Sequence, residues 1–209
     1  FKLFEATTES TPSNTVTREQ SLILNGTTGH VTIVNNPSQH LTSVFTIEGW
    51  FRVESFNRSW ATIIATGENS WRLHREANNN RIRFDANVNA ATSTYFPSLI
   101  ADIDVADGQW RHFAVTSDGT NRYLLIDGQI MAQDIVQPGL QMNVETQGIF
   151  IGENPSNVGR FFNGNVDEVR IWNTHRTPEQ IRSFMYQAVD KNSNGLVGYY
   201  RFNEASGNV

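Results

Sequence analysis

Cationic and aromatic side chains gather around one expected hairpin of the sequence, residues 71–86. Arg72, His74 and Arg83 fall on the face that the apolar residues of this hairpin leave free. Trp60 follows a polar stretch where a loop rim is expected, and Tyr95 comes shortly after the hairpin. An aromatic ring beside planar donors can grip sugar hydroxyls, and arginine adds affinity for acidic groups. These five residues are the candidate ligand contacts; the alternative is an ordinary solvated strand face.

The expected pairing within this hairpin sharpens the hypothesis. If "ANNN" turns the chain, Arg72 faces Asp85, so that opposite charges meet across the ladder. Arg83 then lies opposite His74, which leaves its donors without an evident internal acceptor and suits a carboxylate or sulfate. The expected inner face carries the apolar residues Trp71, Leu73, Phe84 and Ala86.

The sequence shows no carboxylate pair of the kind that sugar hydrolysis needs. Retaining glycosidases hold a nucleophile and an acid about 5–5.5 Å apart. The nearest acidic cluster is Asp102, Asp104 and Asp107 in "IADIDVADG", and a solvated turn explains it. No Gly-x-Ser-x-Gly, His-Glu-x-x-His or phosphate-loop motif occurs. We therefore expect a non-catalytic protein, with a glycoside hydrolase or lyase that uses an unrecognised carboxylate pair as the alternative.

Composition excludes several classes of function. The 209 residues carry a formal charge of −5 and no Lys/Arg-rich run, which argues against nucleic acid and anionic lipid as partners. The chain has no cysteine, so disulfides and thiolate zinc sites are excluded. The longest apolar runs, such as "YLLI", are too short to span a bilayer, and we expect no membrane insertion.

Short β-favouring runs, separated by Gly, Asn, Asp and Pro, recur along most of the chain. About a dozen such runs predict an all-β, two-sheet antiparallel sandwich. Asp-Gly pairs at 118–119 and 127–128 predict a meander of strands 110–117, 122–127 and 129–133. Residues 1–18, rich in Thr, Ser and Asn, are expected to be a linker or N-terminal extension, and residues 19–209 to form one domain.

One short helix is predicted near the C-terminus. "TPEQ" at 177–180 has the Thr-x-x-Gln pattern of a capping box, with proline at the first helical position. Ile181, Phe184 and Met185 follow at helical spacing, and a lid on a sheet edge is the expected role.

Four stretches resemble the laminin-G-like, or concanavalin A-like, jelly-roll domains. "DGQWRHFAVTSDGTNRYLLIDGQ" is similar to the central signature of that family, in which an Asp-Gly-x-Trp strand precedes an aliphatic strand ending in Asp-Gly. "SLILNGTTGHVTIV", "FTIEGWFRV" and "FFNGNVDEVRIWNTHRTPEQI" resemble its opening hairpin, an inner strand and its closing strand. Together they cover roughly residues 20–185 and imply a jelly roll. Trp50, Trp110 and Trp172 lie within these strand motifs and are expected to be core residues.

The resemblance also implies a structural calcium ion. Its ligands would be Asp167 of the closing strand and the loop at Asn25 and Gly26. Simple alternation places Asp167 on one strand face with Val169 and Ile171, where a carboxylate needs a partner. A salt bridge or backbone amides are the alternatives to a metal.

The expected function is that of a non-catalytic glycan- or surface-recognition module in an extracellular, bacterial, multidomain protein. Adhesion, or service as an accessory to a polysaccharide-acting enzyme, would be its task. Its partners would be a glycan or cell-surface ligand and neighbouring domains of the same chain, at a secreted or cell-surface location. A structural spacer without a ligand is the alternative.

Overall fold

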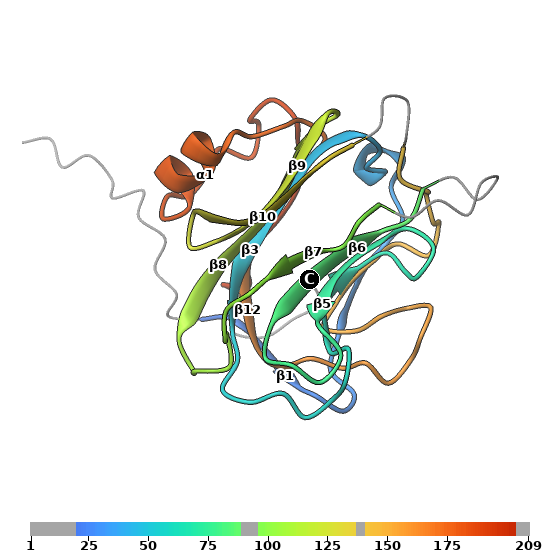
Figure 1. The fold of residues 1–209 in the computed structure, drawn as a ribbon, viewed down its shortest axis with the longest axis vertical. Helices are drawn as coiled ribbons and strands as arrows, with labels where there is room; N and C mark the ends of the chain where they lie inside the picture. The colour runs from blue at the N-terminus through green and yellow to red at the C-terminus, as the bar shows by residue number, and fades with distance from the viewer. Residues whose placement is uncertain (1–19, 89–95, 137–140, 204–209) are drawn as a thin grey trace, which may run out of the picture.

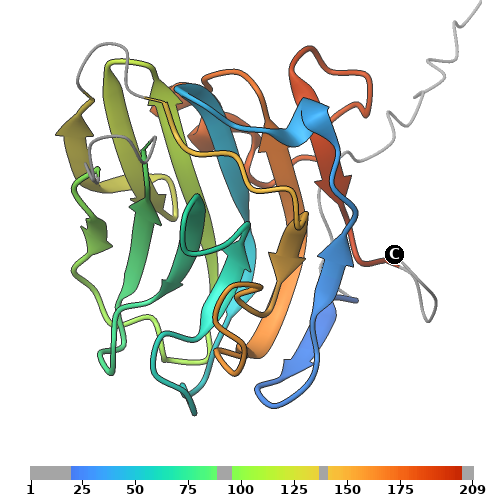
Figure 2. The same ribbon diagram turned by 90° about the vertical axis from the view of Figure 1, so that its right-hand side faces the viewer.

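The computed structural model describes residues 20–88, 96–136 and 141–203. The predicted linker, residues 1–18, lies outside the described residues. Over the described ranges, the non-β elements are a 3₁₀ turn, η1 (Pro37–Gln39), and a short helix, α1 (Pro178–Phe184). Two antiparallel sheets pack face to face (Figure 1), and the perpendicular view shows their strands side by side (Figure 2). The predicted sandwich with one short helix near the C-terminus is confirmed.

The two sheets divide the strands almost equally. The first sheet has, in spatial order, β1 (Leu22–Asn25), β12 (Asn163–Trp172), β3 (Val44–Arg52), β8 (Trp110–Asp118), β9 (Asn121–Ile126) and β10 (Gln129–Ile135), and β13 (Leu196–Tyr200) also pairs with β12. The second sheet has β2 (Val31–Ile33), β11 (Ile149–Ile151), β4 (Thr62–Ala65), β5 (Trp71–Arg75), β6 (Ile82–Ala86) and β7 (Leu99–Ala101). We call them the seven-stranded and the six-stranded sheet.

The predicted meander is β8, β9 and β10. Asp127 and Gly128 join β9 to β10 with φ angles of 51° and 73°, which is the left-handed pair that a tight hairpin turn requires. At the preceding turn, the Asp118 carboxylate accepts hydrogen bonds from the amides of Thr120 and Asn121. Both turns therefore lie at the Asp-Gly pairs where the sequence predicted them.

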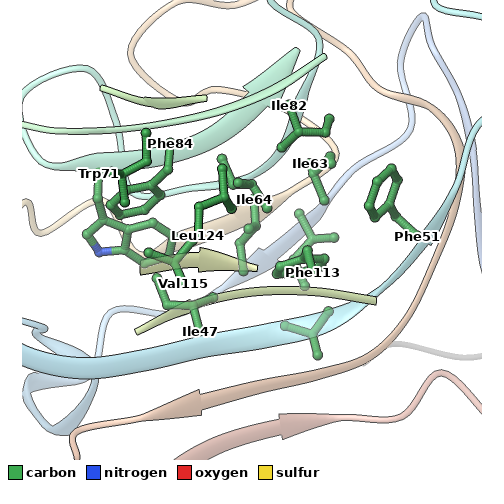
Figure 3. Packing of buried hydrophobic residues seen from close by; sticks show 14 of the residues in the cluster. Ile47, Phe51, Ile63, Ile64, Trp71, Ile82, Phe84, Phe113, Val115 and Leu124 are labelled. Carbon is green, nitrogen blue, oxygen red and sulfur yellow. The ribbon is translucent and has the colours of Figure 1, made fainter. Parts of the chain in front are cut away.

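The core fills the space between the sheets with aliphatic and aromatic side chains (Figure 3). In the β5–β6 hairpin, Leu73 pairs with Phe84 and Trp71 with Ala86, as the sequence predicts. Trp71 and Phe84 extend from this hairpin toward Leu124 of the seven-stranded sheet (Figure 3). Full burial of one large apolar side chain contributes about 1.5–3 kcal/mol. The same pairing turns Arg72, His74, Arg83 and Asp85 to the outer side of the six-stranded sheet.

A β-bulge in β12 makes the predicted face of Asp167 wrong. The register passes from Asp167 opposite Trp50 to Arg170 opposite Glu48, so an extra residue interrupts the alternation. Glu168, at the bulge, has a φ of 50°. Val169 and Ile171 therefore lie in the core, whereas Asp167 shares the outer side of the sheet with Trp50.

Helix α1 covers a face of the seven-stranded sheet, not the sheet edge that the sequence suggested. Its capping box is formed as predicted, with Thr177 and Gln180 bonding to each other's backbone. Ile181 is buried against Ala114 of β8 and Leu125 of β9. Helix α1 lies on the side of the seven-stranded sheet away from the six-stranded sheet (Figure 1). Within the described ranges, no helix is long and apolar enough to cross a membrane.

The three tryptophans expected in the core have different positions. Trp172 and Trp50 are buried, but on the outer side of the seven-stranded sheet beneath the C-terminal segment. Trp172 donates to the Glu48 carboxylate at 2.9 Å, and Trp50 donates to the Met185 carbonyl at 3.0 Å. Trp110 is half-buried, with a guanidinium group 5.7 Å from its ring centroid. The sequence motifs predicted core positions for all three: Trp50 and Trp172 are buried, although outside the cluster between the sheets, and the prediction for Trp110 is wrong.

Candidate functional site

Asp85 organises the outer face of the β5–β6 hairpin. One carboxylate oxygen accepts from Arg72 Nη2 at 2.9 Å and from His74 Nε2 at 3.0 Å. The other accepts from Arg83 Nε at 2.7 Å and from Ser98 Oγ at 2.6 Å. Burial disfavours the ionised carboxylate, but the hydrogen bonds from His74, Ser98 and Arg83 outweigh it and hold the pKa of Asp85 well below its usual range. The carboxylate therefore stays ionised and fixes two arginines.

His74 lies inside this network and not at the surface. Its side chain is fully buried, Nδ1 lies 2.8 Å from the Arg75 carbonyl oxygen, and Nε2 lies against Asp85. A ligand approaching the outer face cannot touch a fully buried ring, so the prediction that His74 contacts a ligand directly is wrong. Its role is to hold the carboxylate of Asp85 in place.

Arg83 is half satisfied by the protein. Its Nε bonds to Asp85, which corrects the expectation that it lacks an internal acceptor. Its two terminal nitrogens have no hydrogen-bond partner in the part of the chain that the structure describes. About a quarter of the side chain, 27%, is exposed. The guanidinium group is thus fixed through Nε, and its two terminal nitrogens can donate to a ligand on the outer face of the sheet.

Trp60 lies beside this arginine in an unusual backbone conformation. Its φ is 58°, in the left-handed region that bulky residues rarely occupy. Its amide donates to the Ala77 carbonyl at 3.1 Å, and its own carbonyl accepts from Thr62 Oγ1 at 3.1 Å. The ring centroid lies 5.5 Å from that of His74 and 5.7 Å from the guanidinium carbon of Arg83. Trp60 therefore supports the arginine from the side.

A polar cavity of about 420 Å³ opens over this cluster, at one end of β5 and β6. We call it the Arg83 cavity; its lining residues are Glu68, Asn69, Arg72, Arg83, Asp85, Ala86, Asn87, Phe96 and Ser98. Of the predicted contacts, Arg72 and Arg83 line it, whereas Trp60 and His74 do not. Tyr95 lies outside the described residues. The cavity has the size of a small-molecule site, and its walls carry far more polar groups than usual.

The loop after β4 closes one side of the cavity. Glu68 accepts from Arg160 Nη1 at 2.5 Å and from Asn154 Nδ2 at 2.6 Å, and its other oxygen lies 3.4 Å from Arg72 Nη1. The Asn87 side chain donates to the Glu68 carbonyl at 2.5 Å. Sequence reasoning missed these wall residues, because no local pattern joins segments so far apart in the chain.

The predicted calcium ligands do not meet in one place. Asn25 pairs with Asn163, four residues before Asp167 on β12, which is roughly 13 Å along a strand. The Asn25 side-chain oxygen instead accepts from the backbone amides of residues 27–29. The Gly26 carbonyl accepts from Asn57 and Arg58, each at 3.4 Å. The oxygens of Asn25, Gly26 and Asp167 therefore do not fit a shared ion. Among the described residues, no group of three or more His, Cys, Asp or Glu side chains that could hold a metal was found.

The acidic cluster before β8 forms turn and surface contacts, as the solvated-turn explanation expects. Asp102 pairs with Arg81 at 2.7 Å, and Asp104 accepts from Asn80 at 3.1 Å. Asp107 pairs with Arg111. These contacts account for the three carboxylates without any catalytic role.

The fold is a two-sheet antiparallel β-sandwich with a polar cavity on the outer face of the six-stranded sheet. A family model for the concanavalin A-like lectin/glucanases superfamily matches residues 25–182. The chain belongs to this superfamily, as its sequence resemblance implied. A search of curated protein sequences returned no match.

Solved structures with the same fold include several named for carbohydrate binding. A Bacteroides ovatus protein designated as carbohydrate binding is 20% identical, with a TM-score of 0.69 over 87% of this chain and 52% of its own. A Ruminococcus gnavus sialidase module, CBM40, is 12% identical with a TM-score of 0.64, over 81% of this chain and 98% of its own. Domain 4 of an extracellular arabinanase from Geobacillus stearothermophilus, solved with arabinotriose, is 17% identical with a TM-score of 0.59, over 80% of this chain and 76% of its own. The chain thus spans about half the length of the Bacteroides protein.

Proposed function

We propose that this chain is a glycan-recognition module that binds its ligand in the Arg83 cavity. The observation that carries the proposal is the pair of unshared donors on Arg83, fixed by Asp85 and facing a polar cavity. Planar donors of known orientation distinguish sugars by their hydroxyl and carboxylate geometry. The carbohydrate-binding names of similar structures support the same function.

Arg83 favours a ligand that carries an acidic group. Asp85 neutralises one of the two arginines that it binds, so the pair keeps one positive charge toward the cavity. Glu68, the other carboxylate of the lining, pairs with Arg160 and lies 3.4 Å from Arg72, so three arginines face two carboxylates around the cavity. A carboxylate or sulfate would meet the uncommitted end of Arg83 without displacing an internal contact.

A glycan array with neutral, acidic and sulfated sugars tests the proposed function. We expect binding by the wild type and a loss of at least about tenfold in affinity for Arg83→Gln, because a hydrogen bond to a charged group contributes about 1.5–3 kcal/mol. Lys191→Gln is the matched control, since it removes one positive charge from an exposed turn. Absence of binding by the wild type to every glycan on the array would favour the alternative function, a structural spacer without a ligand. An unchanged affinity of Arg83→Gln would place the site elsewhere.

Binding without catalysis is the better account of this cavity. A general acid needs a carboxyl group that is protonated near its working pH, which requires a raised pKa. The pKa of Asp85 is shifted the opposite way, and both carboxylates of the lining already pair with arginine. Release of reducing sugar from any polysaccharide in the array, abolished by Asp85→Asn, would support the glycosidase alternative.

The setting that we propose is a secreted or cell-surface, bacterial protein in which this module serves adhesion or assists a polysaccharide-acting enzyme. Two similar structures support it by their names, since they are domains of an arabinanase and of a sialidase. Detection of the native protein in the culture medium or at the cell surface, with specific antibodies, would test the location. Its confinement to the cytosol would contradict it.

A further inference from the structure

A second cavity adjoins the Arg83 cavity. It has a volume of about 430 Å³, and we call it the Thr146 cavity; its lining residues are Asn69, Asn143, Val144, Glu145, Thr146 and Gln147. Asn69 lines both cavities. The two cavities are therefore neighbouring parts of one surface that meet at Asn69.

The protein fixes the shape of this junction through its own hydrogen bonds. The Glu145 carboxylate accepts from the backbone amide of Asn69 at 3.0 Å and from Gln147 Nε2 at 2.9 Å. Ser70 Oγ donates to the Asn143 carbonyl at 2.5 Å, and the Asn143 amide donates to the Asn87 carbonyl at 2.9 Å. The segment 143–147 is thus tied to the same loop that closes the Arg83 cavity.

The two cavities offer different chemistry. The Arg83 cavity presents a cationic group with two uncommitted donors. In the Thr146 cavity, the Thr146 hydroxyl and the Asn69 side-chain amide have no hydrogen-bond partner in the described part of the chain, and the Glu145 carboxylate is engaged by its neighbours. Neutral hydroxyl and amide groups suit neutral sugar hydroxyls, whereas the cationic end suits an anion.

We propose that the site binds an oligosaccharide, with an acidic unit in the Arg83 cavity and at least one neutral unit across Asn69 in the Thr146 cavity. This inference rests on the proposed function and adds a minimum length and a direction to the ligand. A single acidic sugar fills only the first cavity. The second unit adds contacts at Thr146 and Gln147.

Titration calorimetry with four probes tests this inference. Glucuronic acid and N-acetylneuraminic acid are single acidic sugars, whereas aldotetrauronic acid and sialyllactose carry an acidic unit attached to neutral sugars. We expect at least one of the two longer probes to bind about tenfold more tightly than its own acidic monosaccharide. Equal affinities within both pairs would overturn the inference.

Variants separate the contributions of the two cavities. The variant Thr146→Val changes an exposed side chain whose hydroxyl has no hydrogen-bond partner among the described residues, and we expect it to weaken the longer probe about three- to tenfold while leaving the monosaccharide unchanged. Arg83→Gln should weaken both, and Lys191→Gln neither. An equal loss for both probes in Thr146→Val would contradict a second subsite.

The outcomes also distinguish this inference from the proposed function. If none of the four probes binds but neutral glycans on the array do, the acidic oligosaccharide is wrong and glycan recognition stands. If no glycan on the array binds either, both the acidic-oligosaccharide inference and the proposed glycan recognition are wrong. Melting curves of each variant show whether a lost affinity reflects a lost fold.

Discussion

Asp85 sets the geometry of the candidate site at the scale of single residues. Its four hydrogen bonds hold Arg72, His74, Arg83 and Ser98 in one arrangement. A buried carboxylate with this many donors is strongly stabilised as the anion, and its loss removes the acceptor that holds Arg83 and one of the two carboxylates near Arg72.

Asp85→Asn keeps the shape of the side chain and removes its charge. We expect it to lower the free energy of unfolding by about 2–3 kcal/mol at pH 7, below the full cost of breaking a buried ion pair because Arg83 is partly exposed. Urea unfolding measures this. A variant as stable as the wild type would show that the network does not hold the hairpin.

The pH dependence of stability gives a second test of Asp85. Its folded pKa lies below the unfolded value of about 3.9, so the unfolded chain takes up the proton first as the pH falls. Its contribution is complete above about pH 5 and is lost as the pH drops toward the folded pKa. The stability gap between the wild type and Asp85→Asn should therefore narrow between pH 6 and pH 2.5. A constant gap would contradict the shift.

The sequence predicted some of the residue contacts in the site and missed others. Charge pairing predicted Arg72 opposite Asp85 and His74 opposite Arg83, and the register is as expected. It missed that Asp85 also takes its diagonal neighbour His74 and, two residues back on its own strand, Arg83. Alternation gives the face of each residue, but not which of several acceptors within reach a long side chain will choose.

At the scale of elements, α1 and the cavity lie on opposite outer faces of the sandwich. The helix packs on β8 and β9, whereas the cavity opens over β5 and β6. Changes to the helix should therefore alter stability without altering ligand binding.

Two substitutions in α1 test this separation. Ile181→Ala should lower the free energy of unfolding by about 2–4 kcal/mol, because Ile181 is fully buried, and Thr177→Ala by about 1 kcal/mol through loss of the N-cap. Thermal or urea unfolding measures both, and calorimetry at a temperature where the variants stay folded should show unchanged glycan affinity. A large loss of affinity would mean that the two faces are coupled.

The sequence predicted elements well where a local signal exists. The capping box of α1 and the Asp-Gly turns of the meander involve neighbours in the chain, and both form as expected. The bulge at Glu168 has no such signal, since its left-handed residue is neither glycine nor asparagine. One extra residue reverses the alternation, and that reversal is why the predicted face of Asp167 was wrong.

For the molecule as a whole, the sandwich was predictable from the strand pattern and the site was not. The walls of the two cavities come from residues 68–72, 83–87, 96–98 and 143–147. Only the completed pairing of β4, β5, β6 and β7 and the hydrogen bonds among their loops bring these segments together. Such contacts depend on side chains far apart in sequence, where neither periodicity nor spacing carries information.

We expect one copy of this module to bind its ligand weakly and several linked copies to bind it more strongly. We expect two copies joined by a flexible linker to bind a surface coated with the ligand about 10²–10⁴-fold more tightly than one copy, provided the linker spans two sites. Surface plasmon resonance measures this, with a tandem of one wild-type and one Arg83→Gln copy as the control. Equal binding by all three proteins would argue against recognition through this cavity.

The most direct measurement is a crystal structure of the chain in complex with an acidic oligosaccharide such as sialyllactose or aldotetrauronic acid. We expect the sugar over β5 and β6, with an acidic oxygen within hydrogen-bond distance of the terminal nitrogens of Arg83 and a neutral unit beside Thr146. A ligand bound on the seven-stranded sheet, or an Arg83 cavity left without sugar, would contradict it.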